Sequence, residues 1–110
     1  MAVTADENTT RWDCHPDRRS TDLISADNTP AHRGLSLGVA EYTAEQYGEL
    51  QRHDDQEAVY CVSGQGIIRV GDDEYEILPG RAFFIGRGVA HATRRTSAEP
   101  VKVVYVHAPD

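Results

Sequence analysis

Residue types that commonly bind metals occur close together between positions 51 and 57. They are Gln51, His53 and Glu57. On an extended strand, residues 51 and 53 point to the same side, so Gln51 and His53 can share one site. Asp54 and Asp55 form a turn signal, which lets Glu57 return to that site on the next strand. This stretch is therefore the first candidate for chemistry in the chain.

A second histidine, His91, follows a glycine-rich turn far along the chain and can complete the cluster. Two imidazoles, a carboxylate and an amide oxygen suit divalent iron, manganese, nickel or zinc. On spacing alone the alternative is a solvated turn in which a histidine stands beside acidic residues. Whether these residues form a metal site or a solvated turn depends on how the secondary structure places their side chains.

Short runs of β-branched, aromatic and aliphatic residues follow one another after residue 35, and each ends at a Gly, Pro or Asp turn signal. This pattern predicts an all-β domain, a sandwich or a barrel. Residues 43–50 are the only stretch where one helical turn is expected. The predicted strands cover residues 35–39, 58–62, 67–70, 74–77, 82–85, 91–95 and 101–107.

The first 34 residues are polar and irregular, with few large apolar side chains. We expect residues 1–34 to be an arm that is partly disordered or contributes an edge strand, and residues 35–110 to form the barrel. The two regions together make one domain, because 110 residues leave no room for a second.

Composition restricts the partners and the compartment. The net charge is −7, and most of the acidic excess lies in residues 35–63. An acidic chain repels phosphate, so nucleic acid and anionic membranes are not expected partners. The two cysteines, Cys14 and Cys61, have no C-x-x-C spacing, and the N-terminus carries no apolar leader. We expect a cytoplasmic protein with reduced thiols.

The spacing around the first group resembles the first motif of the small single-domain cupins. That motif runs Gly, five residues, His-x-His, three or four residues, Glu, six residues, Gly. This chain has Gln51-x-His53, three residues, Glu57, six residues and Gly64. Glu45 stands where the family has its first glycine. The most informative departure is Gln51, which stands where the family usually has its first histidine.

A second stretch resembles the second cupin motif, Gly, five residues, Pro-x-Gly, two residues, His, three residues, Asn. This chain has Gly80, five residues, Gly86-x-Gly88, two residues, His91, three residues and Arg95. Gly86 replaces the proline and Arg95 replaces the asparagine. Both motifs occur in the family's order, and the resemblance covers about residues 35–107.

The resemblance implies a cupin-type jelly-roll β-barrel, or double-stranded β-helix, with one divalent metal inside it. Carried over by position, the ligands are His53, Glu57 and His91, with Gln51 at the fourth place; the metal can be Fe, Mn, Zn or Ni. If Gln51 stays off the metal, two histidines and one carboxylate leave positions open, as in non-haem Fe(II) sites that use O₂. If it ligates, fewer positions remain for a substrate.

Other side chains on the same strands have two interpretations each. Strand alternation from His91 puts Arg95 on the metal side, where it can anchor a carboxylate or phosphate of a substrate. The alternative for Arg95 is an ion pair with a surface acid at the barrel mouth. His107 shares a face with Tyr105, so one interpretation is a cavity-lining acid–base role; we expect the other, a position at the exposed end of its strand. We expect Asp55 in a solvated turn.

The resemblance favours a metalloenzyme that acts on a small molecule, of the dioxygenase, isomerase, lyase or cyclase type. It does not define the reaction. A binding or sensing cupin without turnover is one alternative, and a cupin with a vestigial metal site is another. A homodimer is expected, because pairing removes an exposed sheet edge.

Overall fold

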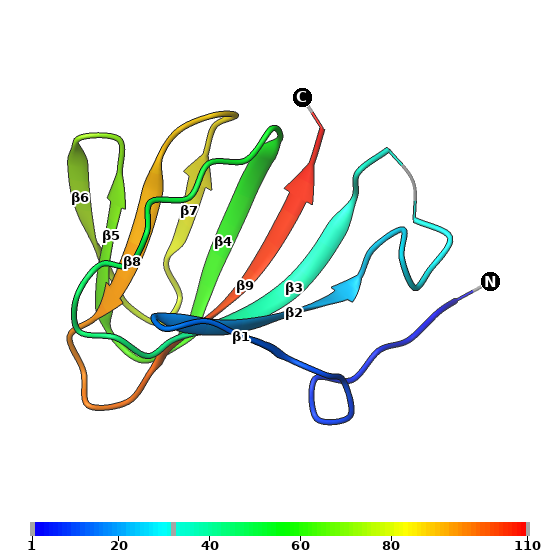
Figure 1. Ribbon diagram of the computed structural model, residues 1–110, viewed down its shortest axis with the longest axis horizontal. Coiled ribbons are helices and arrows are strands. Elements are labelled where there is room, and N and C mark those ends of the chain that lie inside the picture. Colours follow the sequence, from blue (N-terminus) through cyan, green and yellow to red (C-terminus); the bar gives the residue numbers. More distant parts are fainter. Residues whose placement is uncertain (1, 32, 110) are drawn as a thin grey trace.

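The computed structural model describes residues 2–31 and 33–109, and all of its regular structure is β-strand (Figure 1). This confirms the all-β prediction. The helical turn expected in residues 43–50 is wrong, since this stretch is an irregular loop with bends. Each element is a strand; the nine are β1 (Asp13–Cys14), β2 (Arg18–Ile24), β3 (Ser36–Tyr42), β4 (Gln56–Ser63), β5 (Gly66–Val70), β6 (Asp73–Ile77), β7 (Ala82–Ile85), β8 (His91–Arg95) and β9 (Val101–Ala108).

The strands form two antiparallel sheets. The larger sheet has six strands in the order β1-β2-β3-β9-β4-β7, and the smaller has three in the order β6-β5-β8. In Figure 1 the chain passes between the two sheets several times, and the long loop after β3 runs across to the small sheet before it returns to β4. Two stacked antiparallel sheets with such crossings are the architecture of a jelly roll.

Alternation along the strands builds a single core. Along β4, Val59 and Cys61 are buried, whereas Tyr60 and Val62 between them are exposed. The inner residues of the large sheet pack against those of the small sheet, of which Ile68 is an example. This period of two is the pattern expected when one face of a sheet is buried.

The β5–β6 hairpin shows how local sequence fixes the register. Val70 pairs with Asp73 across the two residues Gly71 and Asp72, and Gly71 has a φ of 62°. A positive φ at this position is what a tight hairpin turn demands, and glycine adopts it without strain. The predicted strands 67–70 and 74–77 are therefore joined as a hairpin.

The N-terminal segment is joined to the large sheet. Strand β2 pairs with β3 along most of its length, from Arg18 opposite Tyr42 to Asp22 opposite Gly38. Strand β1 pairs with β2 and lies at the end of the sheet. A domain boundary at residue 34 stays a prediction. Within the described part of the chain, no helix is long and apolar enough to cross a membrane.

Candidate metal centre

The structure brings Gln51, His53, Glu57 and His91 together from three places in the chain. Gln51 and His53 lie in the loop before β4, Glu57 is the second residue of β4, and His91 begins β8. Gln51 and His91 exchange two backbone hydrogen bonds of 2.8 and 2.9 Å. Residues paired in this way project their side chains to the same face, which explains why a loop residue and a strand residue share one site.

Three of these side chains direct ligand atoms at one point. His91 Nε2 lies 3.4 Å from Glu57 Oε1, and His53 Nε2 lies 3.7 Å from the same oxygen. The three ligand atoms all lie within 4.8 Å of one another. Ligands bonded to one transition metal at about 2.0–2.2 Å lie about 3–3.5 Å apart, so the two distances to Glu57 are close to those of a metal site, and a bound metal would draw the two histidine nitrogens together.

The environment of Glu57 is a second test of that fit. Glu57 is 8% exposed and His91 4% exposed. Glu57 Oε1 is buried and has no hydrogen-bond partner among the described residues. A buried carboxylate oxygen without a partner is costly, and native structures normally compensate it. A cation at the point where His53 and His91 converge would supply that compensation, so the residues present fit a divalent metal.

The backbone prepares His91 to act as a ligand. Its Nδ1 lies 3.0 Å from the carbonyl oxygen of Val89, close enough to donate a hydrogen bond. Donation from Nδ1 leaves the lone pair on Nε2, the atom that faces Glu57. Metal-binding histidines typically use their second nitrogen in this way, which fixes both the tautomer and the ring orientation.

His107 belongs to this site, and the expectation of an exposed strand end is wrong. Its side chain is 14% exposed, and its Nε2 lies 3.7 Å from Glu57 Oε2. Its Nδ1 lies 2.9 Å from Asp55 Oδ1, so Asp55 is a partner of the site and more than a solvated turn residue. The His107 ring also packs edge-on against His53, with the ring centroids 4.8 Å apart.

The pKa values of the two histidines that face Glu57 are shifted in opposite directions. Burial lowers the pKa of His53 by more than the nearby Glu57 charge raises it, and repulsion from His107 and His91 also acts to lower this pKa. Burial also acts to lower the pKa of His91, but the Glu57 carboxylate and the Val89 carbonyl outweigh it, so this pKa is raised. Desolvation and the Glu57 charge raise the pKa of Tyr42 to about 12, which keeps this phenol neutral.

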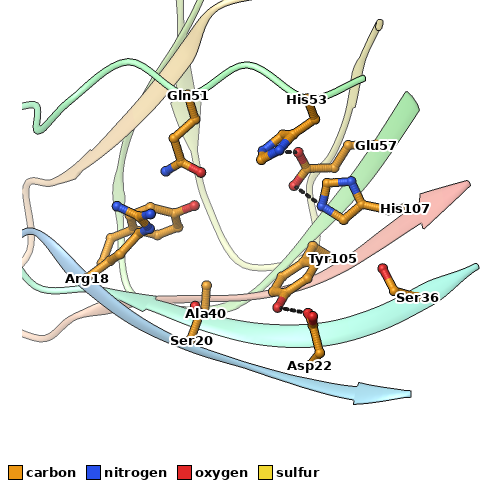
Figure 2. Close-up of a pocket in the computed structure, with 11 residues that line it drawn as sticks. Arg18, Ser20, Asp22, Ser36, Ala40, Gln51, His53, Glu57, Tyr105 and His107 are labelled. Atoms are coloured by element: carbon orange, nitrogen blue, oxygen red, sulfur yellow. Dashed lines mark hydrogen bonds and ion pairs between the residues drawn. The ribbon is translucent and has the colours of Figure 1, made fainter. Parts of the chain in front are cut away.

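A cavity of about 360 Å³ opens beside the cluster. It lies over the inner face of the large sheet, to which Glu57 of β4 also belongs, and Gln51 and His53 face β2 from the loop on the other side (Figure 2). Small ligands typically occupy pockets of about this size. Strands β2, β3 and β9 supply the floor; its polar side chains are Arg18, Ser20, Asp22, Ser36, Tyr42, Tyr105 and His107.

Arg95 lies outside this cavity, which holds a different arginine. Arg95 Nε donates to the carbonyl of Thr43, its Nη1 donates to that of Ser97, and it lies 3.4 Å from Glu45. The basic side chain among the cavity-lining residues is that of Arg18. The role of Arg95 as a substrate anchor stays a prediction, and its observed contacts resemble the expected alternative of a surface ion pair.

The sequence carried a signal for some of the missed residues. Strand alternation groups His107 with Tyr105, so both were candidates for the inner face as soon as Tyr105 was assigned to it. Arg18 and Asp22 had no such signal. They lie in a polar segment, and only the pairing of β2 with β3 brings them to the cavity.

Comparison with known proteins identifies the family. Residues 38–107 match the Cupin domain family. The chain therefore belongs to the cupins, and both spaced motifs lie within or beside the matched region. Among solved structures, the polyketide cyclase RemF from Streptomyces resistomycificus superposes with a TM-score of 0.82 at 18% identity, covering 100% of this chain and 81% of that one. This likeness confirms the cupin jelly-roll fold.

Curated relatives include both an enzyme and a regulator. L-ectoine synthase of Vibrio cholerae serotype O1 is 30% identical over 79 residues, which are 71% of this chain and 57% of that protein. The MmsAB operon regulatory protein of Pseudomonas aeruginosa is 28% identical over 76 residues, 66% of this chain and 25% of the regulator. The chain thus spans a little over half the length of the synthase that it matches.

Proposed function

We propose that this cupin binds one divalent transition metal through His53, Glu57 and His91. The observation that carries the proposal is the buried Glu57 Oε1, which has no hydrogen-bond partner among the described residues and faces the Nε2 atoms of both histidines. Iron, manganese, zinc and nickel all suit two imidazoles and a carboxylate. Gln51 lines the same cavity, and we propose it as a weak fourth ligand or as a group that orients a bound molecule.

The further proposal is that the protein is a metalloenzyme for a small molecule, of the dioxygenase, isomerase, lyase or cyclase type. Three protein ligands leave positions open, and the cavity of about 360 Å³ lies next to them. When bound, the metal supplies Lewis-acid polarisation of a carbonyl or enolate, or activation of O₂. The chain's own polar groups bind and orient the molecule beside it. Similarity to a synthase and to a cyclase supports this class.

A sensing role without turnover is the second candidate. The similarity to the MmsAB operon regulatory protein favours it, because a cupin barrel can bind a ligand as part of a regulator. The two candidates share the metal centre and differ in whether the bound molecule changes. Anaerobic reconstitution with Fe(II), followed by measurement of O₂ uptake with candidate substrates, separates oxygenase chemistry from binding alone.

Elemental analysis tests the metal centre directly. Protein purified without added metal should contain close to one equivalent of a transition metal. His53→Ala and His91→Ala should each reduce the occupancy at least about tenfold, since each removes one of three ligands. His15→Ala is the matched control, because His15 is an exposed histidine of the N-terminal segment and should leave the metal content unchanged. Metal-free wild-type protein that also fails to take up any of the four metals would overturn the proposal.

We also propose that the chain forms a homodimer. The outer face of β4 and β7 exposes large apolar side chains, among them Tyr60, Val62 and Phe84. Strand β7 lies at one end of the large sheet, so this apolar face borders a sheet edge. A second copy of the chain that packs on this face would cover the apolar side chains and protect the edge.

A further inference from the structure

The inner face of β2 carries charges of opposite sign at the two ends of the cavity. Arg18, Ser20 and Asp22 alternate along this strand, and all three line the cavity. Figure 2 shows Arg18 and Asp22 at opposite ends of this stretch of β2, with Ser20 between them and the candidate ligands His53 and Glu57 above. Four residues of strand separate the Cα atoms of Arg18 and Asp22 by about 13 Å.

The Arg18 end is built around a buried carboxylate. Asp17 is 8% exposed, and its Oδ1 lies 3.0 Å from Arg18 Nη1. Asp17 lies so close to Gly48 that a Cβ at position 48 would be 2.3 Å from its Oδ2, so the glycine makes room for it. This contact uses one guanidinium nitrogen. Nε and Nη2 have no partner among the described residues, and they can donate together to an anionic group.

The Asp22 end presents acceptors. Tyr105 Oη donates to Asp22 Oδ1 over 2.5 Å. Because the phenol's single proton is used in this bond, the phenol oxygen and Asp22 Oδ2 are left as acceptors. Tyr105 and Asp22 both pair with Gly38, and a Cβ at position 38 would lie 2.3 Å from Tyr105 Oη. The glycine lets the ring cross β3 and reach Asp22. A negative charge with several free acceptors recognises an ammonium or another cationic N–H donor.

We propose that the cavity selects a small zwitterion, whose anionic group binds Arg18 and whose cationic group binds the Asp22–Tyr105 pair. Taking the Cα spacing of about 13 Å as the distance between the two binding groups, and about 3 Å for the hydrogen bond at each end, the charged groups of the ligand would lie about 7 Å apart. The chain between those groups then passes beside the metal centre. A dianion meets repulsion at Asp22 and a dication meets it at Arg18, so both ends contribute to selectivity. The inference deepens the proposed function, but binding by β2 does not itself require the metal.

Three probes with the same pentamethylene chain test the assignment: 6-aminohexanoate, heptanedioate and 1,5-diaminopentane. Each is titrated into the metal-free full-length protein, with chelator present, and followed by NMR chemical shifts. The aminohexanoate should bind at least about tenfold more tightly than the diacid or the diamine, because only it satisfies both ends. Binding of the diacid or the diamine as tightly as the aminohexanoate would overturn the proposal, as would a failure of all three to shift cavity residues.

Variants assign each end separately. Arg18→Gln should weaken 6-aminohexanoate about tenfold or more without weakening the diamine, and Asp22→Asn should weaken it without weakening the diacid. Arg19→Gln is the matched control, because Arg19 points to the other face, where it pairs with Glu41 and stacks on Trp12. Arg18→Lys keeps a cation beside Asp17 and should retain part of the affinity, which covers the case in which Arg18→Gln does not fold. An equal loss in the Arg19→Gln variant would contradict the assignment.

The metal-free design separates the two proposals. If the protein takes up no metal but still selects the zwitterion, the proposed metalloenzyme fails and the recognition by β2 stands. If the metal binds but the zwitterion is not preferred, the recognition fails and the metal centre stands.

Discussion

Glu57 has different neighbours at its two carboxylate oxygens. Its Oε1 faces His53 and His91, and its Oε2 lies 3.7 Å from His107 Nε2. Asp55 holds the other nitrogen of His107, just as the Val89 carbonyl holds that of His91. The carboxylate is therefore oriented from one side while its other oxygen is presented to the candidate metal position. Such support of a ligand by its neighbours keeps a metal site rigid.

A proton and the metal compete for His91, so the stabilisation of the fold by the metal should depend on pH. The pKa of His91 is raised, so its protonated form stabilises the metal-free fold below the unfolded-state pKa of about 6.5. That contribution is lost as pH rises through the folded pKa. The metal requires neutral Nε2 and must displace the proton. The rise in melting temperature on adding metal should therefore be small near pH ~5.5 and increase toward pH ~8, as measured by thermal unfolding with and without chelator.

Glu57→Gln provides the control for this linkage. It removes the charge that raises the His91 pKa, so the metal-free variant should lose the fall in stability between about pH 6 and 8. It also removes the anionic ligand, and the metal should no longer raise the melting temperature at any of these values. A wild-type metal effect of constant size across the range would contradict the proton competition.

Residues that pair in successive strands form rows across the large sheet, and these rows explain which side chains lie close together. Val59 of β4, Tyr105 of β9, Gly38 of β3 and Asp22 of β2 are successive partners in the ladders. The row beside it contains Glu57, opposite His107. Inner-face neighbours in such rows are close in space even where they are far apart in sequence. The metal centre and the charged ends of the cavity are thus parts of one ladder system.

Gly38→Ala tests this row. The added Cβ would lie 2.3 Å from the Tyr105 ring and 2.5 Å from the Thr21 carbonyl oxygen, so the ring must move and strand β2 must yield. We expect a loss of about 1–3 kcal/mol in the free energy of unfolding, typical of overpacking, together with loss of the Tyr105–Asp22 bond. Denaturant unfolding and a crystal structure of the variant measure the two effects. Gly86→Ala is the control, since its Cβ meets nothing closer than 3.7 Å and should change stability little.

Strand pairing also explains which features could be predicted from the sequence and which could not. Seven strands followed from alternation and turn residues, because these are local signals. The cluster of Gln51, His53, Glu57 and His91 followed from the spacing of the two motifs. This spacing resembles that of a known family, whose fold brings these positions together. Arg18 was beyond reach, because its place depends on the pairing of β2 with β3, a non-local choice that a polar strand specifies weakly.

On the scale of the whole molecule, charge and apolar surface occupy different faces. The polar cavity lies on the inner side of the large sheet, whereas the outer side of β4 and β7 exposes Tyr60, Val62 and Phe84, the last at 68%. In the register, Phe84 is opposite Ala58 and Tyr60 is opposite Ala82, so small and large apolar side chains form one continuous outer surface. A surface of this kind at a sheet edge is typical of an interface between copies.

Phe84→Asp tests whether this surface pairs two copies. Size-exclusion chromatography with light scattering should give twice the chain mass for the wild type and the single-chain mass for the variant at micromolar concentration, because a buried charge opposes association. The isolated chain should stay folded, since Phe84 points away from the core. Leu35→Asp is the matched control, because Leu35 is also exposed but lies before β3, which β9 separates from β4 in the sheet, and it should leave the dimer intact. A monomeric wild type, or equal dissociation in both variants, would show that the apolar face of β4 and β7 does not join two copies.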